Sequence, residues 1–401
     1  MYIGYDEDQE ALRHELRAYY DELLTDEIRA ELAREHGVGP RTREIARQMA
    51  KDGWLGIGWP KEYGGQGRSE IEQFVFFDES MRARAPVPML TVNTVGPTIM
   101  KNGNDEQRKR FLPKILAGEI HFCIGYSEPG AGTDLASLQT RADPAPDGSG
   151  DFIINGQKLW TSLASDADYC WLAVRTDQDA PKHGGLSMFL VDMKSPGIRV
   201  DPLELLSAHD INAVFFDDVR VPKENLVGGL NKGWKLITNQ LNHERVTVCA
   251  PGMIEGAYES VVEWARETRR ADGRRVIDDE WVQVNLAKVK AGIHALRLMN
   301  WKVAWTATEG MKLNPADAST IKVFGTEFFL DALRLLMEVM GQRGYLRPES
   351  DGSDAGQEVA GGAAETLFRS LLILTYGGGT NEIQRDLIGL FGLGLPRVPR
   401  M

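Results

Sequence analysis

The chain has 401 residues, of which 42% are hydrophobic and 26% are charged, and its formal net charge is -12 at pH 7. A chain of this length can bury a large core and favours two or three domains. The acidic balance argues against nucleic acid or an anionic membrane as a main partner, because both are bound through basic surface. We find neither an apolar run of about 18 residues nor a basic N-terminus followed by an apolar stretch, so we expect no membrane span and no signal peptide.

The cysteines suggest a reducing compartment. Cys123, Cys170 and Cys249 are odd in number and far apart in the sequence. They lack the spacing of a metal site, and an odd count does not suit a disulfide framework. We therefore expect three small core residues in a cytoplasmic protein, and no metal site.

The N-terminal part of the chain has a helical pattern. From Asp8 to Met49 the sequence is heavily charged, and apolar residues recur at three- and four-residue spacing on one face, namely Leu12, Leu16, Tyr19 and Leu23. A glycine-rich turn at 60–67 precedes further helical segments through Leu116. This part of the chain predicts helix packing rather than chemistry.

The composition then shifts to short β-rich runs separated by Gly, Pro and Asp. Strands are predicted over residues 152–154, 169–174, 187–191, 198–200 and 213–216, which indicates a small antiparallel β-domain. Helical periodicity returns at Asn231 and continues to the end, interrupted by an acidic, glycine-rich loop at 347–362 that we expect to be exposed. The predicted division is 1–121 helical, 122–230 β and 231–401 helical.

Two stretches of the β-domain favour a ligand site. In Ile124–Asp134 a short apolar run breaks into Pro129, Gly130 and Gly132, so a strand leads into a turn that lets backbone approach a flat ligand closely. In 152–162 an Asn-Gly hairpin signal precedes a strand carrying Trp160, Thr161 and Ser162, which offer a ring face and two hydroxyls. The alternative for either stretch is a surface hairpin with a buried Trp.

One carboxylate interrupts an apolar helix face. Between Gly233 and Val248 the apolar residues Trp234, Ile237, Leu241 and Val248 form a stripe, and Glu244 falls within it. Burial without a partner raises the pKa of a carboxyl group, which suits it to proton transfer near neutral pH. An ion pair with a buried cation, or a helix cap, is the structural alternative.

Near the C-terminus a glycine run, 377–379, follows Tyr376 and opens a helix whose predicted apolar face is Ile383, Leu387, Ile388 and Phe391. Free N–H groups at the start of a helix, with the side chains of Thr380 and Asn381, favour an anion site. The alternative is a capped helix after a flexible linker.

Taken together, these stretches resemble the acyl-CoA dehydrogenases. The resemblance covers almost the whole chain and also rests on the segments 58–67, 107–113, 215–222 with Asn225 and Gly228, and 378–385, whose order and spacing match. It implies an α+β fold with an N-terminal helical domain, a central β-barrel and a C-terminal four-helix bundle. It also implies FAD as cofactor and α,β-dehydrogenation of an acyl-CoA thioester to a trans-2-enoyl-CoA, with the β-hydride passing to flavin N5 and electrons leaving through an electron-transfer flavoprotein.

The resemblance also implies functions for individual residues. FAD would be bound by Tyr126, Ser127, Thr133, Trp160, Thr161, Ser162, Gly379, Thr380, Asn381 and Glu382, and acyl-CoA by Thr133, Asn242, Arg245 and Gly378. Most family members carry the catalytic base at the position of Gly378, whereas isovaleryl and long-chain types carry it in a Glu-Arg pair that matches Glu244-Arg245. Glu244 is therefore predicted to take the pro-R α-proton.

Two departures from the family pattern predict a mixed assembly. Members that form homotetramers hold the neighbour's flavin with an Arg-x-x-Phe-Gly segment and a Gln-x-x-Gly-Gly segment. In the first segment this chain has Asp272 in place of the aromatic residue. In the second segment Glu338 places a further negative charge near the neighbour's diphosphate. A paralogous partner chain, in an α2β2 heterotetramer, would supply the missing contacts. This pattern is similar to the actinobacterial enzymes of steroid side-chain breakdown, which suggests a bulky acyl-CoA substrate.

Two alternatives to a dehydrogenase stay open at this point. An oxidase or monooxygenase on the same scaffold would use oxygen directly. A non-catalytic subunit of a heteromeric dehydrogenase would leave the chemistry to its partner, although this chain keeps Glu244 and the flavin motifs.

Overall fold

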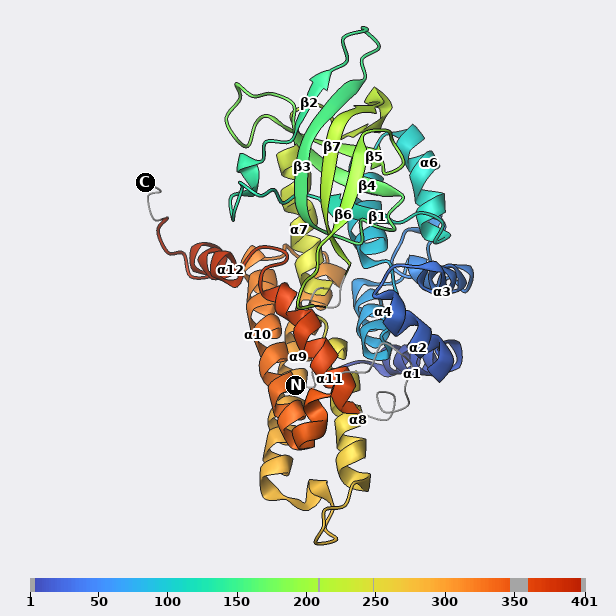
Figure 1. The fold of residues 1–401 in the computed structure, drawn as a ribbon, viewed down its shortest axis with the longest axis vertical. Coiled ribbons are helices and arrows are strands. Elements are labelled where there is room, and N and C mark those ends of the chain that lie inside the picture. The colour runs from blue at the N-terminus through green and yellow to red at the C-terminus, as the bar shows by residue number, and fades with distance from the viewer. Residues whose placement is uncertain (1–3, 208–209, 248, 347–359, 398–401) are drawn as a thin grey trace.

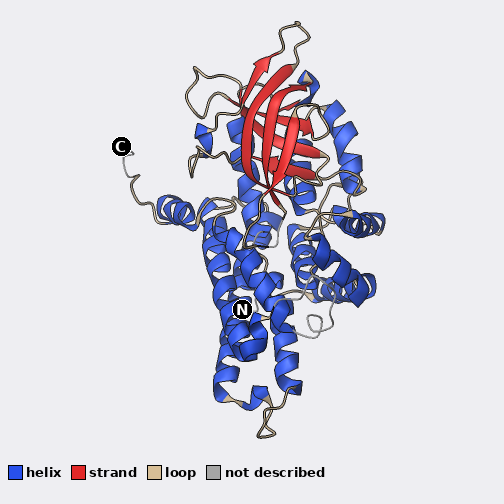
Figure 2. Ribbon diagram, in the orientation of Figure 1, coloured by secondary structure: helices blue, strands red, loops and turns tan. Residues whose placement is uncertain are grey.

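The computed structural model describes residues 4–207, 210–247, 249–346 and 360–397, and within these only the backbone course of 241–247 and 360–363. The β-structure lies at one end of the molecule and the long C-terminal helices at the other, while the N-terminal helices pack along the side (Figures 1 and 2). This arrangement confirms the predicted α+β fold. No helix among the described residues is long and apolar enough to cross a membrane.

The single helical pattern at 8–49 is in fact three helices. Asp6 begins the first with a capping box, Thr25 caps the second, and Gly39, with φ of 135°, precedes Pro40 at the start of the third. The N-terminal elements are α1 (Glu7–Leu23), α2 (Asp26–Glu35), α3 (Pro40–Lys51), α4 (Glu70–Ala83), a π-helical turn (Leu90–Val95), α5 (Gly96–Asn102) and α6 (Asp105–Leu116).

The buried face of α1 differs by one position from the prediction. Leu12, Leu16 and Tyr20 are buried, whereas Tyr19 and Leu23 are only partly buried against the same core. Successive steps of four residues keep 12, 16 and 20 on one side of the helix, and residues 19 and 23 lie beside that row.

The β-domain is a single sheet that contains both antiparallel and parallel strand pairs. Its strands are β1 (Phe122–Gly125), β2 (Arg141–Pro144), β3 (Phe152–Ser162), β4 (Tyr169–Arg175), β5 (Leu186–Asp192), β6 (Ile198–Pro202), β7 (Ile211–Val221) and β8 (Leu226–Val227). The described strands follow the order β6-β7-β3-β2-β4-β5-β8. The expectation of antiparallel pairing is wrong for β1 with β4 and for β2 with β4, which are parallel pairs, whereas β2 pairs antiparallel with β3.

The hairpin predicted at Asn155-Gly156 is absent, because β3 runs straight through it. The pairing of β3 with β7 shifts register between Ile154 and Gly156, which marks a bulge. A Cβ at position 156 would lie 2.7 Å from the backbone Cα of Thr140. Gly156 therefore allows two backbones to approach closely rather than forming a turn.

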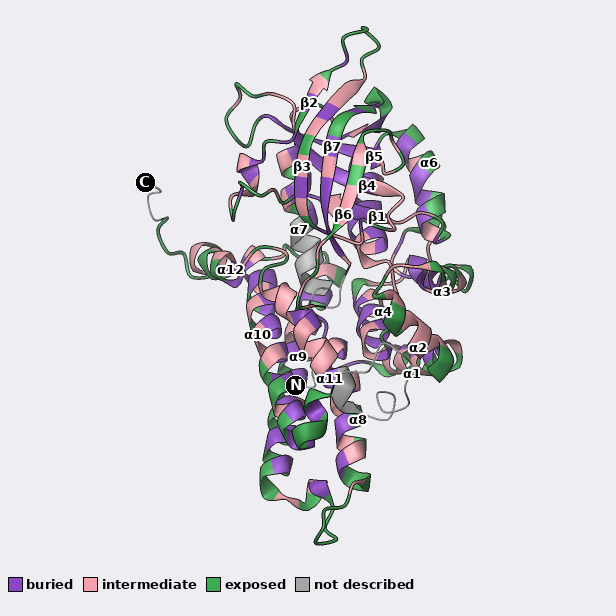
Figure 3. Cartoon of the chain, viewed as in Figure 1, coloured by how far each residue is buried: buried purple, intermediate pink, exposed green. Residues whose placement is uncertain are grey.

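Strand β4 separates two of the cores. Because side chains alternate along a strand, Cys170, Leu172 and Val174 face the interior of the sheet. Trp171 and Ala173 face the core shared with the N-terminal helices and Leu236 of the following helix. All three cysteines are buried and free, as predicted. Five consecutive residues of β4 are therefore buried, and buried residues recur along the strands of the sheet (Figure 3).

The C-terminal helices share a third core. They are α7 (Gly233–Thr247), α8 (Gly252–Glu267), α9 (Glu280–Thr308), α10 (Pro315–Met340), α11 (Ala360–Leu371) and α12 (Asn381–Leu387). Helices α8 to α11 pack together as the predicted bundle. Most of the loop expected at 347–362 lies outside the described residues, and its last three residues already belong to α11.

A buried charge network joins the N-terminal helices to this bundle. Arg297 on α9 lies 2.5 Å from Glu255 of α8 and 3.4 Å from Asp78 of α4. The Asp78 carboxylate also accepts the backbone N–H of Gly252 at 2.6 Å. Complete burial raises the pKa of Asp78 to about 6, helped by Glu255 and Glu79 and opposed by Arg297.

This shift predicts how Asp78 affects stability. A folded-state pKa of about 6, above the ordinary 3.8, means that its contribution to the free energy of unfolding is fully present below pH 4 and is lost as pH rises through 6. At roughly 1.4 kcal/mol per pKa unit, the loss is about 2–3 kcal/mol. Asp78→Asn removes this titration and keeps an acceptor for Gly252. Urea unfolding between pH 4.5 and 7.5 should show the variant gaining stability relative to the parent as pH rises, and parallel curves would contradict the assignment.

Candidate active site

The two stretches predicted to form a ligand site lie side by side. The backbone N–H of Leu159 on β3 donates to the carbonyl of Ser127 at 2.8 Å. The Lys158 ammonium, fully buried, donates to the Tyr126 carbonyl at 3.2 Å and to Glu128 Oε1 at 2.7 Å. Glu128 also accepts the N–H groups of Gln139 and Thr140. The turn after β1 is therefore anchored to β3 from both ends.

Charge and burial act against each other in this pair. Burial lowers the pKa of Lys158, and the Glu128 carboxylate partly offsets that effect. Burial would raise the pKa of Glu128, but the Lys158 ammonium outweighs it and holds the pKa below its ordinary value. Each group thus keeps the other charged in a site that water does not reach.

Burial separates the three predicted residues at the end of β3. Trp160 is 54% exposed and has φ of 62°, an uncommon conformation for a residue with a side chain. Ser162 is half-buried, whereas Thr161 is buried and its hydroxyl has no hydrogen-bond partner among the described residues. Trp160 therefore offers an open ring face, and Ser162 is the hydroxyl nearer to that open side. Ser127 and Thr133, on the preceding turn, are exposed.

Helix α7 contacts this region through a buried amide. Gln240 Oε1 accepts the indole N–H of Trp171 at 2.8 Å and the hydroxyl of Tyr126. The same indole N–H also lies 3.1 Å from the Tyr126 hydroxyl. Tyr126 thus points toward α7, whereas Ser127, which follows it, is exposed.

The predicted base lies on α7 itself. Residues 242, 244 and 245 are part of this helix, and the side chains of Asn242, Glu244 and Arg245 lie outside the described residues. Of the apolar stripe, Ile237 is buried and Trp234 packs against the same core. The side chain of Leu241 lies outside the described residues, as does Val248 altogether.

The C-terminal glycine loop leaves room for a ligand. Gly378 and Gly379 have φ of 69° and 92°, and a Cβ built at Gly378 would meet no atom within 4 Å. Thr380 caps the short helix α12, and Glu382 is exposed. The predicted apolar face of α12 is not buried in this chain; its buried residues are instead the polar Asn381 and Gln384.

A buried lysine holds this loop. Lys322 on α10 donates to Asn381 Oδ1 at 2.7 Å and to the Thr375 carbonyl at 3.0 Å. The carbonyl of Lys322 lies 3.7 Å from the sulfur of Cys249, just after α7. Lys322 therefore connects the glycine loop to the end of the helix that carries Glu244.

Sequence reasoning missed Lys158, Gln240 and Lys322. A signal existed for Lys322, because it lies beside Ile321 in a row with Gly325 and Phe329 that is buried along α10. The periodicity that drew attention to Glu244 also applies there.

The described residues fit a flat, anionic cofactor. Trp160 presents a ring face, the glycine loop leaves open space, and hydroxyl and backbone groups flank both. Among the described residues no cluster of His, Cys, Asp and Glu could hold a metal ion.

Comparison with known proteins identifies the family. Residues 6–119 match the acyl-CoA dehydrogenase N-terminal domain, residues 123–219 the middle domain and residues 231–391 the C-terminal domain. The chain belongs to the acyl-CoA dehydrogenase family. The resemblance drawn from the motifs is confirmed, and the protein is an enzyme of this family.

Several relatives match this acyl-CoA dehydrogenase over its full length. It is 52% identical to acyl-CoA dehydrogenase FadE26 of Mycobacterium tuberculosis, covering 100% of both chains. Among solved structures, a chain of the ChsE4-ChsE5 complex from Mycobacterium tuberculosis is 51% identical, with a TM-score of 0.90 over 99% of this chain and 100% of that one. The Tcur3481-Tcur3483 steroid ACAD is 46% identical, with a TM-score of 0.90 and the same coverage.

The buried pair at β3 yields a test of stability in this acyl-CoA dehydrogenase. Lys158→Met leaves the Glu128 carboxylate buried without its cation, which should lower the free energy of unfolding by about 3–5 kcal/mol. The control is Lys182→Met, which removes an exposed lysine 2.6 Å from Asp134 and should cost less than about 1 kcal/mol. Equal losses in denaturant unfolding of the two variants would show that burial of Lys158 has no energetic consequence.

Proposed function

We propose that this protein catalyses FAD-dependent α,β-dehydrogenation of a bulky acyl-CoA, with a steroid side-chain thioester as the substrate class. The observation that carries this proposal is sequence similarity over almost the full length of the chain. The sequence is 51% identical to a chain of the ChsE4-ChsE5 complex and 46% identical to a chain of the Tcur3481-Tcur3483 steroid ACAD. The predicted three-domain division at 1–121, 122–230 and 231–401 is part of the proposal.

The proposal assigns FAD to the site built from Tyr126, Ser127, Thr133, Trp160, Thr161, Ser162 and the glycine loop through Glu382. The exposed indole of Trp160 and the open space beside Gly378 support it. When bound, the flavin supplies the acceptor for the β-hydride. Thr133, Asn242, Arg245 and the backbone of Gly378 contact acyl-CoA.

Glu244 accepts the α-proton in this proposal. Position 378, which carries the base in most family members, is glycine here, and residue 244 belongs to helix α7. An α-proton beside a thioester is only weakly acidic, so the reaction requires both a base and stabilisation of the enolate charge.

The proposed base on α7 can be tested by removing the carboxylate at position 244 and introducing one at position 378. Glu244→Gln should lower turnover about 10²- to 10⁴-fold while flavin and acyl-CoA still bind. Adding Gly378→Glu should recover part of the rate, because a Cβ at 378 meets no atom within 4 Å, although its φ of 69° strains a residue with a side chain.

The matched control is Glu244→Gln with Gly378→Ala, which has the same backbone strain and no carboxylate. Stopped-flow reduction of the flavin by acyl-CoA measures the chemical step. Near-normal turnover of Glu244→Gln alone would remove Glu244 from the mechanism.

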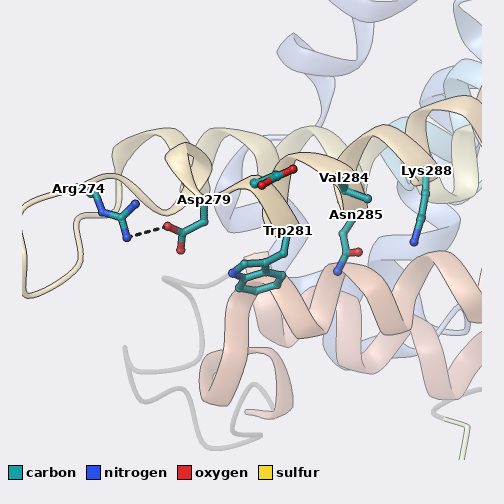
Figure 4. Close-up of a pocket in the computed structure, with 7 residues that line it drawn as sticks. Arg274, Asp279, Trp281, Val284, Asn285 and Lys288 are labelled. Carbon is teal, nitrogen blue, oxygen red and sulfur yellow. Dashed lines mark ion pairs between the residues drawn. The ribbon is translucent and has the colours of Figure 1, made fainter.

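We also propose a paralogous partner chain. In the turn where homotetrameric members hold the neighbour's flavin, three arginines are paired with acids of the same segment: Arg270 with Asp279 at 2.7 Å, Arg274 with Asp279 at 3.1 Å and with Asp272 at 3.0 Å, and Arg275 with Asp278 at 2.7 Å. Arg269, at the position of the family's arginine, instead donates to the Gly273 carbonyl at 2.8 Å. Figure 4 shows the pair of Arg274 and Asp279 beside the exposed Trp281 at the start of α9. Guanidinium groups neutralised in this way are poor ligands for a neighbour's diphosphate.

Glu338 supports the same proposal. It is exposed on α10, and its carboxylate accepts the side-chain amide of Asn285 at 3.2 Å. Asn285 lines a pocket together with Arg274, Asp279 and Trp281. This places negative charge beside the surface that would otherwise meet a neighbour's diphosphate. Exposed apolar residues along α9, namely Trp281, Val284, Leu298 and Trp305, would be covered by the partner.

Co-expression tests the mixed assembly. Expressed alone, the chain should retain little flavin, whereas with its paralogous partner it should form an α2β2 assembly with flavin and steroid-CoA dehydrogenase activity. Flavin absorbance per chain and mass by light scattering are the measurements. A full complement of flavin in an active homotetramer of this chain alone would show the partner to be unnecessary.

The electron acceptor in this proposal is an electron-transfer flavoprotein, and the protein works in the cytoplasm. The similarity to a subunit of the caffeyl-CoA reductase-Etf complex of Acetobacterium woodii, 27% identical, supports the acceptor. Slow reoxidation of the reduced flavin in air would separate this function from that of an oxidase.

A further inference from the structure

Gln240 holds its side chain in a fixed orientation. It is only 2% exposed, and its amide meets the indole N–H of Trp171 at 2.8 Å and the hydroxyl of Tyr126. The indole nitrogen can only donate, so the amide atom that faces it must be the oxygen. The two ends of the amide are thereby distinguished, and Nε2 is directed away from Trp171.

That nitrogen is buried and has no hydrogen-bond partner among the described residues. Leaving a buried donor unpaired is unfavourable, and the great majority of such groups in folded proteins have a partner. Two donors fix the oxygen end, so the nitrogen cannot turn to find an acceptor elsewhere. The arrangement is that of a donor built to meet a group that binds.

Its position indicates which group that is. Residues four apart on a helix lie on the same face, so Gln240 lies one turn before Glu244 and on the same side of α7. Through Tyr126, its oxygen end is joined to the turn that continues into Ser127 and is anchored to β3 by Leu159. Gln240 therefore lies between the predicted base and the predicted flavin segment.

We propose that Gln240 is a ligand-contact residue whose Nε2 donates to a carbonyl oxygen of the bound acyl-CoA. This inference rests on the proposed function. An acyl-CoA carries carbonyl oxygens in its thioester and in the two amides of its pantetheine arm, whereas an alkyl chain has none. The donor thus fixes how far the thioester lies along α7, which sets the distance from the α-carbon to Glu244.

The test compares two buried glutamines. Gln240→Met keeps the length of the side chain and removes the unpaired donor, while Trp171 retains the Tyr126 hydroxyl as acceptor at 3.1 Å. The control is Gln107→Met, since Gln107 is also buried but its Nε2 already donates to the carbonyls of Glu224 and Leu226 at 2.7 and 2.9 Å. Both variants are prepared in the flavin-containing protein, co-expressed with its partner.

We expect the two variants to differ in ligand affinity. Gln240→Met also removes the acceptor of the Tyr126 hydroxyl, so both variants should lower the melting temperature of the ligand-free protein. Gln240→Met should weaken binding of a steroid enoyl-CoA about tenfold, with flavin retained, whereas Gln107→Met should leave that affinity unchanged. Titration of the flavin absorbance with CoA and with the enoyl-CoA measures affinity. A loss with both ligands assigns the pantetheine amides, and a loss with the enoyl-CoA alone assigns the thioester or acyl oxygen.

Two results would overturn the proposal. If Gln240→Met binds the enoyl-CoA within twofold of the parent, the donor does not meet this ligand. If it loses flavin, measured as flavin absorbance per chain, while Gln107→Met keeps it, the donor meets a flavin carbonyl instead. Failure of the proposed function is separate from both, because the parent protein itself would then lack a flavin band or show no response to acyl-CoA.

Discussion

The candidate site depends on a cation that water does not reach. The Lys158 ammonium binds the Glu128 carboxylate and the Tyr126 carbonyl, and so fixes a turn whose own sequence, with Pro129, Gly130 and Gly132, would otherwise be loose. A buried ion pair adds little to stability compared with apolar packing, but separating its two charges leaves each one buried without a partner, which is strongly destabilising. Its effect here is to place Ser127 and Trp160 at fixed positions on neighbouring backbone.

The same device recurs at the other end of the site. Lys322 is also fully buried and also binds a backbone carbonyl and an oxygen of a side chain, those of Thr375 and Asn381. In both places a lysine from a regular element fixes a glycine-containing loop that by itself has many accessible conformations. The regular element supplies rigidity, and the loop supplies backbone that a ligand can approach closely. Helix α7 lies between the two, joined to one through Gln240 and to the other through Cys249.

Sequence periodicity predicts the helices and strands, but it does not predict the buried lysines that anchor the two loops. The helical, β and helical order follows from periodicity alone, and Trp160 stood out because an aromatic residue beside hydroxyls is local information. Lys158 did not stand out, because a lysine in a strand is usually exposed and its partner, Glu128, lies 30 residues away. Asn155-Gly156 predicts a turn for the same reason, since the contact that requires glycine there is with Thr140, which precedes β2 and is distant in the sequence. The functions assigned to Asn242, Glu244 and Arg245 stay predictions.

The backbone at position 378 gives a physical reason for the proposed base to lie on α7. With φ of 69°, Gly378 is in the left-handed region, where a residue with a side chain is strained by about 1 kcal/mol or more. A carboxylate at 378 would depend on a loop held in that strained form, in a segment held by Lys322 and Gln384. Helical backbone imposes no such cost, and α7 is anchored by the packing of Ile237 and the hydrogen bonds of Gln240. With the base on α7, as proposed, the glycine loop would be free to adapt its backbone to the ligand.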